Sequence, residues 1–347
     1  NDMSGQTQSK KLRVGVLRGG PSGEYEISLK TGKNIIDALQ GRSDYEIQDI
    51  FVDRGGVWHV GGISRPAERF LPYVDVIVNA LHGAYGEVGR VQQLLESHNV
   101  PYTGSRPLGS ALGMNKPLAK KFFRAHGFLT PEHTVIKKEN YSPEMLRKIN
   151  TDYPHLRLVK PASAGSSLGV RAVNSHEEFE EAVAQAFEHS DSVMVEEYLN
   201  GREATCGVVE GSSGQEVYAL HPIEIRVLSC DPLPDAENSG ENKRNRIWSY
   251  ESKYRDDLHE LICPGNFTVD EIRLIQQAAI GAHRALGLRH YSRSDFILNR
   301  LGVHILEVNT LPGLTPMSLF PRALSVAGLS LGEFLDHIIA LALKEDK

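Results

Sequence analysis

Apolar and polar positions along residues 12–115 predict strands that alternate with helices. Short apolar runs indicate buried strands, and apolar residues three or four positions apart indicate helices with one covered face. The expected strands are residues 12–17, 45–52 and 74–80, and the expected helical segments are residues 27–39 and 91–95. This alternation favours a parallel sheet covered by helices, so we expect an N-terminal α/β domain over residues 12–115.

The remaining chain predicts two smaller domains of α+β type, residues 116–200 and 201–347. The first should contain helices at 116–126 and 177–187 and strands at 133–136, 156–160, 168–173 and 193–198. The second should contain strands at 203–209 and 218–225, a helix at 271–286, a hairpin at 291–309 and a closing helix at 331–343. A polar stretch within residues 227–254 has a length typical of a lid or binding loop. Residues 1–11 are polar and are expected to form a disordered or expression-derived tail.

Composition narrows the class of protein. The formal net charge of -6 does not indicate the basic surface that binds nucleic acid or an anionic membrane, and neither partner is expected. The three cysteines, Cys206, Cys230 and Cys263, are scattered and predict reduced thiols rather than a disulfide framework. The chain begins without an apolar signal segment and contains no window of about 18 apolar residues. We therefore expect a cytoplasmic protein.

The segment 291–309 carries the most informative chemistry. If its two arms pair about the turn at 299–302, Asp295 lies opposite Glu307 and Arg293 lies opposite Asn309. Side chains alternate between the faces of a strand, so all four should share one face. Two carboxylates and a carboxamide oxygen suit a hard cation such as Mg²⁺, and Arg293 beside them could stabilise negative charge. An exposed polar hairpin end with a cross-strand charge pattern is the alternative.

Four other motifs are individually weaker. Pro312-Gly313 and Ser318 could bind a carboxylate or oxyanion, because the turn presents backbone N–H groups and the serine a hydroxyl. VKPASAGSSLGV, with Lys160, could approach phosphate, although many glycine-rich hairpins are plain turns. VMVEEYLNGRE could hold an adenine, or be a solvated acidic linker. Lys253 and Tyr254, at the exit of the polar loop, could close over phosphates as part of a lid, or be plain surface loop.

The glycine-rich turn GGPSGEYEISL opens a helix whose N-terminus favours anions. It is not the GxGxxG fingerprint of dinucleotide-binding proteins. Glu24 and Glu26 suit a helix N-terminus structurally, or could recognise an ammonium group. His82 follows a strand at the edge where ligands bind in such sheets, although a lone histidine there is often structural.

Taken together, these motifs resemble the D-alanine–D-alanine ligase family of ATP-grasp enzymes. GGPSGEYEISL, ALHGAYGE, PYTGS, KPASAGSSLGV, SYESKY, the Arg293–Asp295 segment and EVNTLPGLTPMSL occur in that family's order, over nearly the whole chain. The resemblance implies a pre-ATP-grasp N-terminal domain followed by a two-part ATP-grasp fold. It also implies a reaction in which ATP activates one D-alanine as an acyl phosphate and a second D-alanine attacks it, for peptidoglycan synthesis.

The resemblance further implies roles for individual residues. Phosphates of ATP would contact Lys116, Lys160, Ser166 and Lys253. Adenine and ribose would be held by Glu196 and Glu203, with backbone groups of Glu197 and Leu199. Two Mg²⁺ ions, with Mn²⁺ as a substitute, would be bound by Asp295, Glu307 and Asn309. The first D-alanine would meet Glu26 and His82, with Glu26 hydrogen-bonded to Ser166 and Tyr254. Arg293 and the Gly313 N–H would form an oxyanion hole, and the second carboxylate would lie at Ser318 and the Leu319 N–H.

The family also implies a homodimer and activation by K⁺. Three features depart from its pattern: Val88 where Asp is usual, Tyr25 where His or Arg is usual, and a long loop at 227–246. They bear on substrate affinity and lid behaviour more than on ATP chemistry. Two alternatives remain open, another ATP-grasp ligase joining a different carboxylate and amine, and a non-catalytic nucleotide-binding regulator. A dinucleotide-dependent oxidoreductase is more distant, because the fingerprint is lacking.

Overall fold

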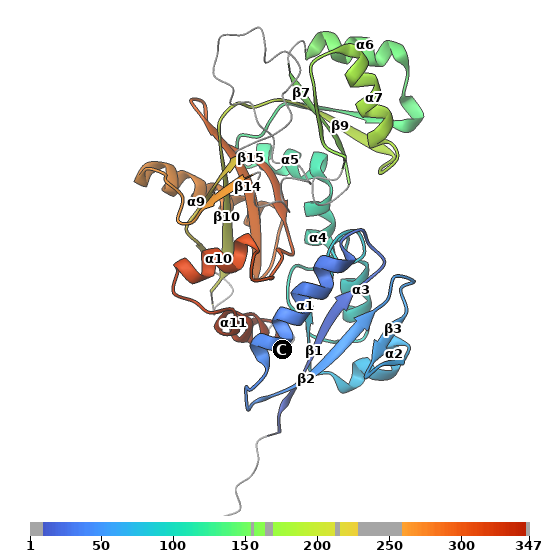
Figure 1. Ribbon diagram of the computed structural model, residues 1–347, viewed down its shortest axis with the longest axis vertical. Coiled ribbons are helices and arrows are strands. Elements are labelled where there is room, and N and C mark those ends of the chain that lie inside the picture. Colours follow the sequence, from blue (N-terminus) through green and yellow to red (C-terminus); the bar gives the residue numbers. More distant parts are fainter. Residues whose placement is uncertain (1–9, 154–155, 164–168, 212–215, 228–258, 345–347) are drawn as a thin grey trace, which may run out of the picture. The chain divides into compact units, whose positions relative to one another are not determined.

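The computed structural model describes residues 10–153, 156–163, 169–211, 216–227 and 259–344 (Figure 1). The chain divides into two compact units. The first contains Asn1–Pro107 and Gly313–Lys347, and the second contains Leu108–Pro312. This division does not test the predicted domain boundaries at residues 115 and 200, which stay a prediction.

A five-stranded sheet forms the centre of the first unit. Its strands, in the order β4-β3-β2-β1-β5, are Ile63–Ser64, Trp58–Val60, Tyr45–Val52, Leu12–Gly19 and Val76–Asn79. β1 runs parallel to both β2 and β5, which confirms the predicted parallel sheet. β3 and β4 add an antiparallel edge that the sequence pattern did not predict.

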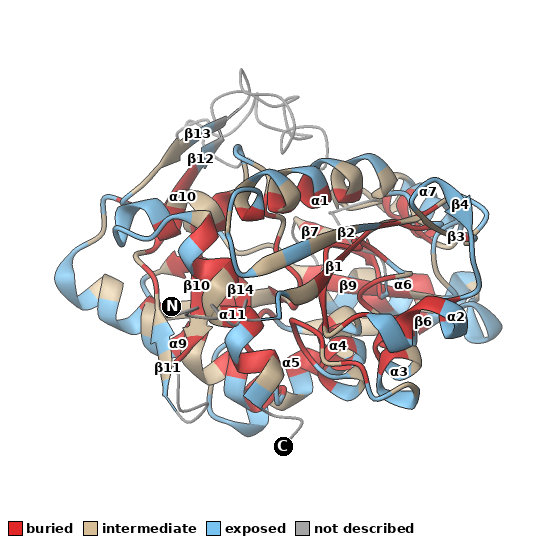
Figure 2. Cartoon of the chain, turned by 90° about the horizontal axis from the view of Figure 1, so that it is seen from below, coloured by how far each residue is buried: buried red, intermediate tan, exposed pale blue. Residues whose placement is uncertain are grey.

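Helices cover this sheet. They are α1 (Tyr25–Leu39), α2 (Ala67–Phe70), the 3₁₀ turn η1 (Leu71–Tyr73), α3 (Arg90–Ser97) and α11 (Leu331–Lys344), and α10 (Leu319–Val326) packs against α11. α11 packs against α1 and β5, and Asp336 accepts a hydrogen bond from the Tyr45 hydroxyl at 3.0 Å. Buried residues lie along β1, whereas α1 is buried along one side and exposed along the other (Figure 2). The last 35 residues of the chain are therefore part of the N-terminal unit.

The second unit contains a four-stranded antiparallel sheet and its helices. The strands, in the order β6-β9-β7-β8, are His133–Lys137, Ser192–Glu197, Arg157–Pro161 and Arg171–Val173. Its helices and 3₁₀ turn are α4 (Pro107–Met114), α5 (Lys116–Ala125), η2 (Lys138–Asn140), α6 (Pro143–Asp152) and α7 (His176–Ala186). β8 returns antiparallel to β7, and the two strands correspond to those predicted at 156–160 and 168–173. α4 and α6 were not predicted.

A six-stranded sheet forms the rest of the second unit. It consists of β13 (His259–Ile262), β12 (Ile223–Val227), β10 (Arg202–Glu210), β14 (Tyr291–Asn299) and β15 (Gly302–Asn309), with β11 (Val217–Ala219) also paired to β10. α9 (Val269–Ala285) packs on this sheet and begins with a capping box between Thr268 and Glu271. The predicted single strand over 218–225 is wrong. Pro222 lies between β11 and β12, which pair with opposite ends of β10, and proline has no N–H to donate to a ladder.

In the part of the chain that the structure describes, no single helix is long and apolar enough to cross a membrane. Taken together, α10 and α11 have the length and apolar composition of a membrane span, but the two helices are bent by 100° at the break between them. Much of its apolar surface is buried in the first unit, including Phe320, Leu324, Phe334 and Ile338.

Candidate active site

The two arms of the β14–β15 hairpin pair as the sequence predicted. Arg293 lies opposite Asn309, and Asp295 lies opposite Glu307. The register shifts immediately afterwards, between Asp295 and Phe296, where a bulge interrupts the ladder. A bulge bends a strand and changes the direction of its side chains. The pairs Arg293–Asn309 and Asp295–Glu307 thus lie directly beside the bulge.

Asp295 is held by two donors. The Thr205 hydroxyl donates to Asp295 Oδ1 at 2.6 Å from the neighbouring strand β10, where Thr205 is the direct partner of Asp295. Arg293 Nε donates to Oδ1 and Nη2 donates to Oδ2, both at 3.1 Å. Asp295 is 8% exposed, so its carboxylate is oriented within a largely buried environment. This contact confirms that Arg293 and Asp295 share one face of the strand.

Glu307 and Asn309 lie on the partner strand. Glu307 Oε2 is 3.6 Å from the ammonium of Lys116, the first residue of α5. Asn309 Oδ1 accepts a hydrogen bond from the Leu311 backbone N–H at 3.0 Å, and a carbonyl oxygen has a second lone pair. Among the described residues, no group of three or more His, Cys, Asp or Glu side chains is arranged to hold a metal ion. The predicted metal set has two carboxylates, and its third donor is the Asn309 amide.

Glu196 is the centre of a buried charge cluster. Its side chain and that of Lys120 are both 0% exposed, and Lys120 Nζ lies 2.7 Å from Glu196 Oε1. Lys160 pairs with the other oxygen, Oε2. Lys160 and Glu196 lie diagonally across the paired strands β7 and β9. The predicted role of Glu196 at adenine or ribose stays a prediction, and here both of its oxygens face lysines.

Burial and pairing shift the pKa of each group in this cluster. Burial lowers the pKa of Lys120 to about 8, against the attraction of Glu196. Although burial opposes ionisation of Glu196, Lys120 and Lys160 lower the pKa of its carboxyl to about 2. Burial also opposes ionisation of Lys160, but the carboxylates of Glu196, Glu307 and Glu203 raise its pKa. All three groups are therefore charged at neutral pH, and Lys160 faces the negative field of three predicted site residues.

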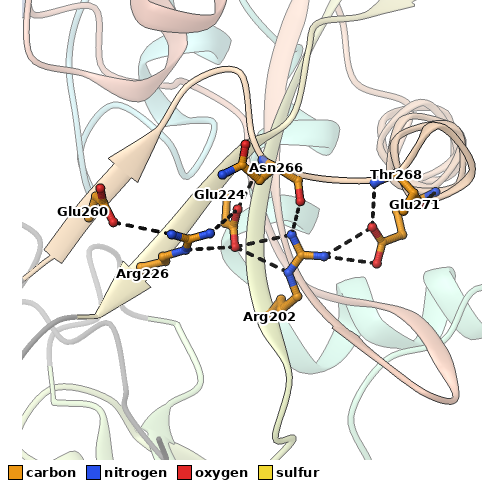
Figure 3. A network of polar contacts seen from close by, with 7 residues as sticks. All are labelled: Arg202, Glu224, Arg226, Glu260, Asn266, Thr268 and Glu271. Carbon is orange, nitrogen blue, oxygen red and sulfur yellow. Dashed lines mark hydrogen bonds and ion pairs between the residues drawn. The ribbon is translucent and has the colours of Figure 1, made fainter.

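A network of polar contacts holds the strand that carries Glu203 (Figure 3). Its neighbour Arg202 contacts Glu271 at 3.2 Å and Glu224 at 3.4 Å. Glu224, which is 3% exposed, also contacts Arg226 Nε at 3.2 Å and accepts from the Asn266 N–H at 3.2 Å. β10, β12 and α9 are thus joined on the strand face opposite Glu203, since neighbouring side chains alternate. The role of Glu203 at adenine or ribose stays a prediction.

In the first unit, the glycine-rich turn after β1 is tied to the segment after β5. Gly19 N–H donates to the Ser28 hydroxyl at 2.8 Å, and Ser28 donates to the Ala80 carbonyl at 2.7 Å. His82 is 4% exposed, with Nε2 at 2.9 Å from Thr31 Oγ1 and Nδ1 at 3.6 Å from Glu87 Oε1. His82 is therefore a well-anchored group at the end of the sheet, and its contact with substrate stays a prediction.

Glu26 lies on the first turn of α1 and is exposed. Its carboxylate pairs with Arg54 at 2.8 Å, and the Arg54 guanidinium lies 4.1 Å above the Tyr25 ring. The sequence did not predict Arg54 as a partner of the residue expected to receive an ammonium. The group that would meet the first substrate therefore already has a cation beside it.

Gly313, Ser318 and Leu319 also belong to the first unit. The Ser318 hydroxyl lies 2.7 Å from Thr315 Oγ1 and accepts from the Thr315 N–H at 3.2 Å. Ser318 is the N-cap residue of α10 and makes no side-chain cap bond, while Leu319 is the first residue of the helix. The N–H groups of a first helical turn have no intrahelical acceptor and favour anions. This agrees with the predicted carboxylate site, which stays a prediction.

The remaining predicted residues are less informative. Ser166, Lys253 and Tyr254 lie outside the described residues. Glu197 accepts a hydrogen bond from the Glu132 N–H at 2.9 Å, and Leu199 lies in the segment between β9 and β10. Two residues that the sequence analysis missed are Thr205 and Lys120. Nothing near Thr205 indicates its role, but Lys120 follows Lys116 by four residues, a spacing that places both on one helical face.

Comparison with known proteins assigns this arrangement to a family. A family model described as the D-ala D-ala ligase C-terminus matches residues 122–340. The D-alanine–D-alanine ligase of Halalkalibacterium halodurans is 36% identical over 336 residues, covering 96% of this chain and 100% of the relative. That of Geobacter sulfurreducens is 35% identical over 335 residues, covering 96% and 95%.

Solved structures of D-alanine–D-alanine ligases are also similar to this chain. The D-alanine–D-alanine ligase from Coxiella burnetii has a TM-score of 0.79 at 26% identity, covering 97% of this chain and 95% of that chain. The ligase from Bacillus anthracis complexed with ATP has a TM-score of 0.76 at 28% identity, covering 97% and 99%. Fold and site thus define an ATP-grasp ligase. The chain belongs to the D-alanine–D-alanine ligase family.

Proposed function

We propose that this enzyme joins two molecules of D-alanine into D-alanyl-D-alanine, with ATP converted to ADP and phosphate, in the synthesis of peptidoglycan. The observation that carries the proposal is the β14–β15 hairpin, where Asp295 pairs with Glu307 beside Arg293 and near Lys116. The family membership supports the substrate, because the relatives over the whole chain bear the name of this reaction.

ATP binding is supported by the ATP-complexed relative and by the lysines of this chain. Lys160 and Lys116 present ammonium groups from β7 and α5, and such groups attract phosphate oxygens. Glu203, Glu196 and the backbone near Glu197 and Leu199 would hold adenine and ribose. Ser166 and Lys253 would add phosphate contacts from segments outside the described residues.

Magnesium fits the donor chemistry of the hairpin. Asp295 and Glu307 offer hard carboxylate oxygens, and Asn309 offers an amide oxygen with one lone pair in use. A divalent cation there would share Asp295 with Arg293 and Thr205, which fix the orientation of that carboxylate. When bound, the ion would neutralise the charge of the transferring phosphoryl group. Mn²⁺ is expected to substitute.

The chemistry then proceeds in two displacements. A carboxylate oxygen of the first D-alanine attacks the γ-phosphorus, and the bond to the β–γ bridging oxygen breaks as ADP leaves. The amine of the second D-alanine attacks the resulting acyl carbon, the carbon–oxygen bond to phosphate breaks, and the amine loses a proton. Arg293 and the Gly313 N–H would stabilise the tetrahedral oxyanion.

The substrates would be held by residues of the first unit. Glu26, near His82, would receive the ammonium of the first D-alanine and hydrogen-bond with Ser166 and Tyr254. Ser318 and the Leu319 N–H would hold the carboxylate of the second. A homodimer, activation by K⁺ and a cytoplasmic location are proposed on family resemblance and sequence.

A different second amine is the main competing function. One structural neighbour is the VanG D-Ala:D-Ser ligase from Enterococcus faecalis, with a TM-score of 0.79 at 26% identity, covering 96% of this chain and 100% of that chain. The fold therefore accommodates both second substrates. Specificity must be decided by substrate measurements.

The deciding experiment measures ADP release with ATP, Mg²⁺ and D-alanine, and identifies the product by mass spectrometry. We expect the dipeptide with D-alanine and none with L-alanine. Mixtures of D-alanine with D-serine or D-lactate identify the second substrate by competition. Nucleotide binding without turnover on any amino acid would instead favour a regulator.

A further inference from the structure

A lysine outside the predicted ATP contacts belongs to the buried charge cluster around Glu196. Lys120 is 0% exposed and contacts Glu196 at 2.7 Å. Its ammonium also donates to Thr130 Oγ1 at 2.9 Å. Burying an ammonium is costly unless every donor is used and the charge is paired. The position of Lys120 therefore has a specific electrostatic consequence for its neighbours.

The cluster contains two cations and one anion. Glu196 places one oxygen toward Lys120 and the other toward Lys160. Because Glu196 is shared, it does not fully neutralise Lys160, and the three side chains together keep one positive charge. Lys160 is 8% exposed, so that charge is the part of the cluster nearest to solvent.

Lys120 is also tied to the hairpin that carries the carboxylates. Thr130, which receives the Lys120 hydrogen bond, donates in turn to the Ile305 carbonyl of β15 at 2.8 Å. The Ile305 N–H donates to the Leu129 carbonyl at 2.8 Å. Ile305 is two residues before Glu307. The Lys120 ammonium is thus bound directly by Glu196 of β9 and by Thr130, and Thr130 links it to the backbone of β15.

We propose that Lys120 is a positioning residue that binds one oxygen of Glu196, so that Lys160 keeps its positive charge available for the phosphates of the nucleotide. This inference rests on the proposed function, because it assigns Lys160 to those phosphates. Without Lys120, Glu196 and Lys160 form a one-to-one pair, and the attraction of Lys160 for phosphate is largely cancelled. When Glu196 is neutral as well, Lys120 is no longer needed.

Calorimetric titration tests this with two probes, Mg-ATP and inorganic tripolyphosphate with Mg²⁺. Lys120→Met should weaken the binding of both about tenfold, the effect of losing roughly one charge-assisted contact. The matched control is Lys121→Met, which removes an exposed lysine from the next position of α5 and should leave both affinities unchanged. In turnover, Lys120→Met should raise KM for ATP and leave kcat close to that of wild type.

The double variant Lys120→Met/Glu196→Gln separates this role from simple packing. Its tripolyphosphate affinity should return to within about threefold of wild type, because Lys160 is then the only charge left in the cluster. Unchanged affinity in Lys120→Met overturns the inference, as does a double variant about tenfold weaker than wild type. Should Lys120→Met alone not fold, the double variant against wild type decides. Failure of the proposed ligation would appear separately, as no ADP release with D-alanine in wild type.

Discussion

Asp295 and Glu307 are direct partners across β14 and β15, at the rung next to the bulge of the hairpin. On an antiparallel pair, side chains of directly opposed residues lie about 5 Å apart on the same face. Two carboxylates that close repel each other unless cations lie between or beside them. Arg293 meets Asp295 and Lys116 meets Glu307, so each carboxylate already has a cationic neighbour.

The first prediction concerns these two carboxylates. Asp295→Asn and Glu307→Gln keep size and remove one metal-binding charge each, so we expect kcat to fall by at least about 100-fold. ADP release at saturating ATP and D-alanine measures this. Glu188→Gln, which neutralises an exposed carboxylate of the same unit, should keep wild-type activity. Near-normal turnover in either hairpin variant would contradict the metal assignment.

The hairpin shows what the sequence could predict. The hairpin and the shared face of Arg293 and Asp295 follow from the period of two along a strand, a local property. Regular pairing from Asn299 and Gly302 would place Asp295 opposite Leu306, and the bulge between Asp295 and Phe296 shifts its partner to Glu307. The strand–helix alternation of the first unit was predictable for the same reason. Lys120 and Thr205 were not, because their partners Glu196 and Asp295 are 76 and 90 residues away in sequence. Such contacts depend on how elements pack, which no local pattern specifies.

The second prediction concerns Thr205, which is 1% exposed and whose hydroxyl donates to Asp295 at 2.6 Å. Thr205→Val keeps the shape of the side chain but removes the donor, so Asp295 loses a fixed orientation. Removing a group that orients a metal ligand typically costs about 10- to 100-fold in metal affinity or activity. We expect the Mg²⁺ concentration for half-maximal turnover to rise about tenfold. In Thr205→Ser, which keeps the hydroxyl, this Mg²⁺ concentration should rise far less. Equal effects in both variants would argue against a role of the Thr205 hydroxyl in orienting Asp295.

The third prediction concerns pH and Glu196, whose carboxyl has a pKa lowered to about 2 by Lys120 and Lys160. A carboxyl with a depressed pKa in the folded state contributes stability above its unfolded value, and that stability is lost as pH falls toward the folded pKa. The advantage of wild type over Glu196→Gln in urea unfolding should therefore shrink by about 1 kcal/mol between pH 6 and pH 3.5. The other ionisable groups are the same in both proteins, so their contributions largely cancel in this difference. A constant difference across this range would contradict the pairing.

The fourth prediction concerns the network of Figure 3. Glu224 is 3% exposed and joins Arg202, Arg226 and the Asn266 N–H. Glu224→Gln leaves Arg202 and Arg226 without their shared carboxylate, so unfolding should become easier by about 2–3 kcal/mol. Glu260→Gln removes only the exposed partner of Arg226, at 3.7 Å, and should change stability by less than about 0.5 kcal/mol. Urea denaturation measures both variants, and similar effects would show that burial of Glu224 is not decisive.

The last prediction concerns Arg54, which pairs with Glu26 at 2.8 Å while lying over Tyr25. If Glu26 receives the ammonium of the first D-alanine, Arg54 competes with the substrate for the same carboxylate. Both side chains are more than 60% exposed, so solvent screens the pair and the competition is weak. Arg54→Ala should therefore lower KM for the first D-alanine about two- to threefold, with kcat unchanged.

The control for Arg54 is Lys33→Ala, which removes a cation of α1 that pairs with Asp37 at 2.6 Å and not with Glu26. It should leave KM for D-alanine unchanged. A rise in KM in Arg54→Ala would show the opposite arrangement, in which Arg54 assists the substrate by contacting its carboxylate. Initial rates over a range of D-alanine at saturating ATP distinguish the two, because the first binding site dominates the curve at low D-alanine.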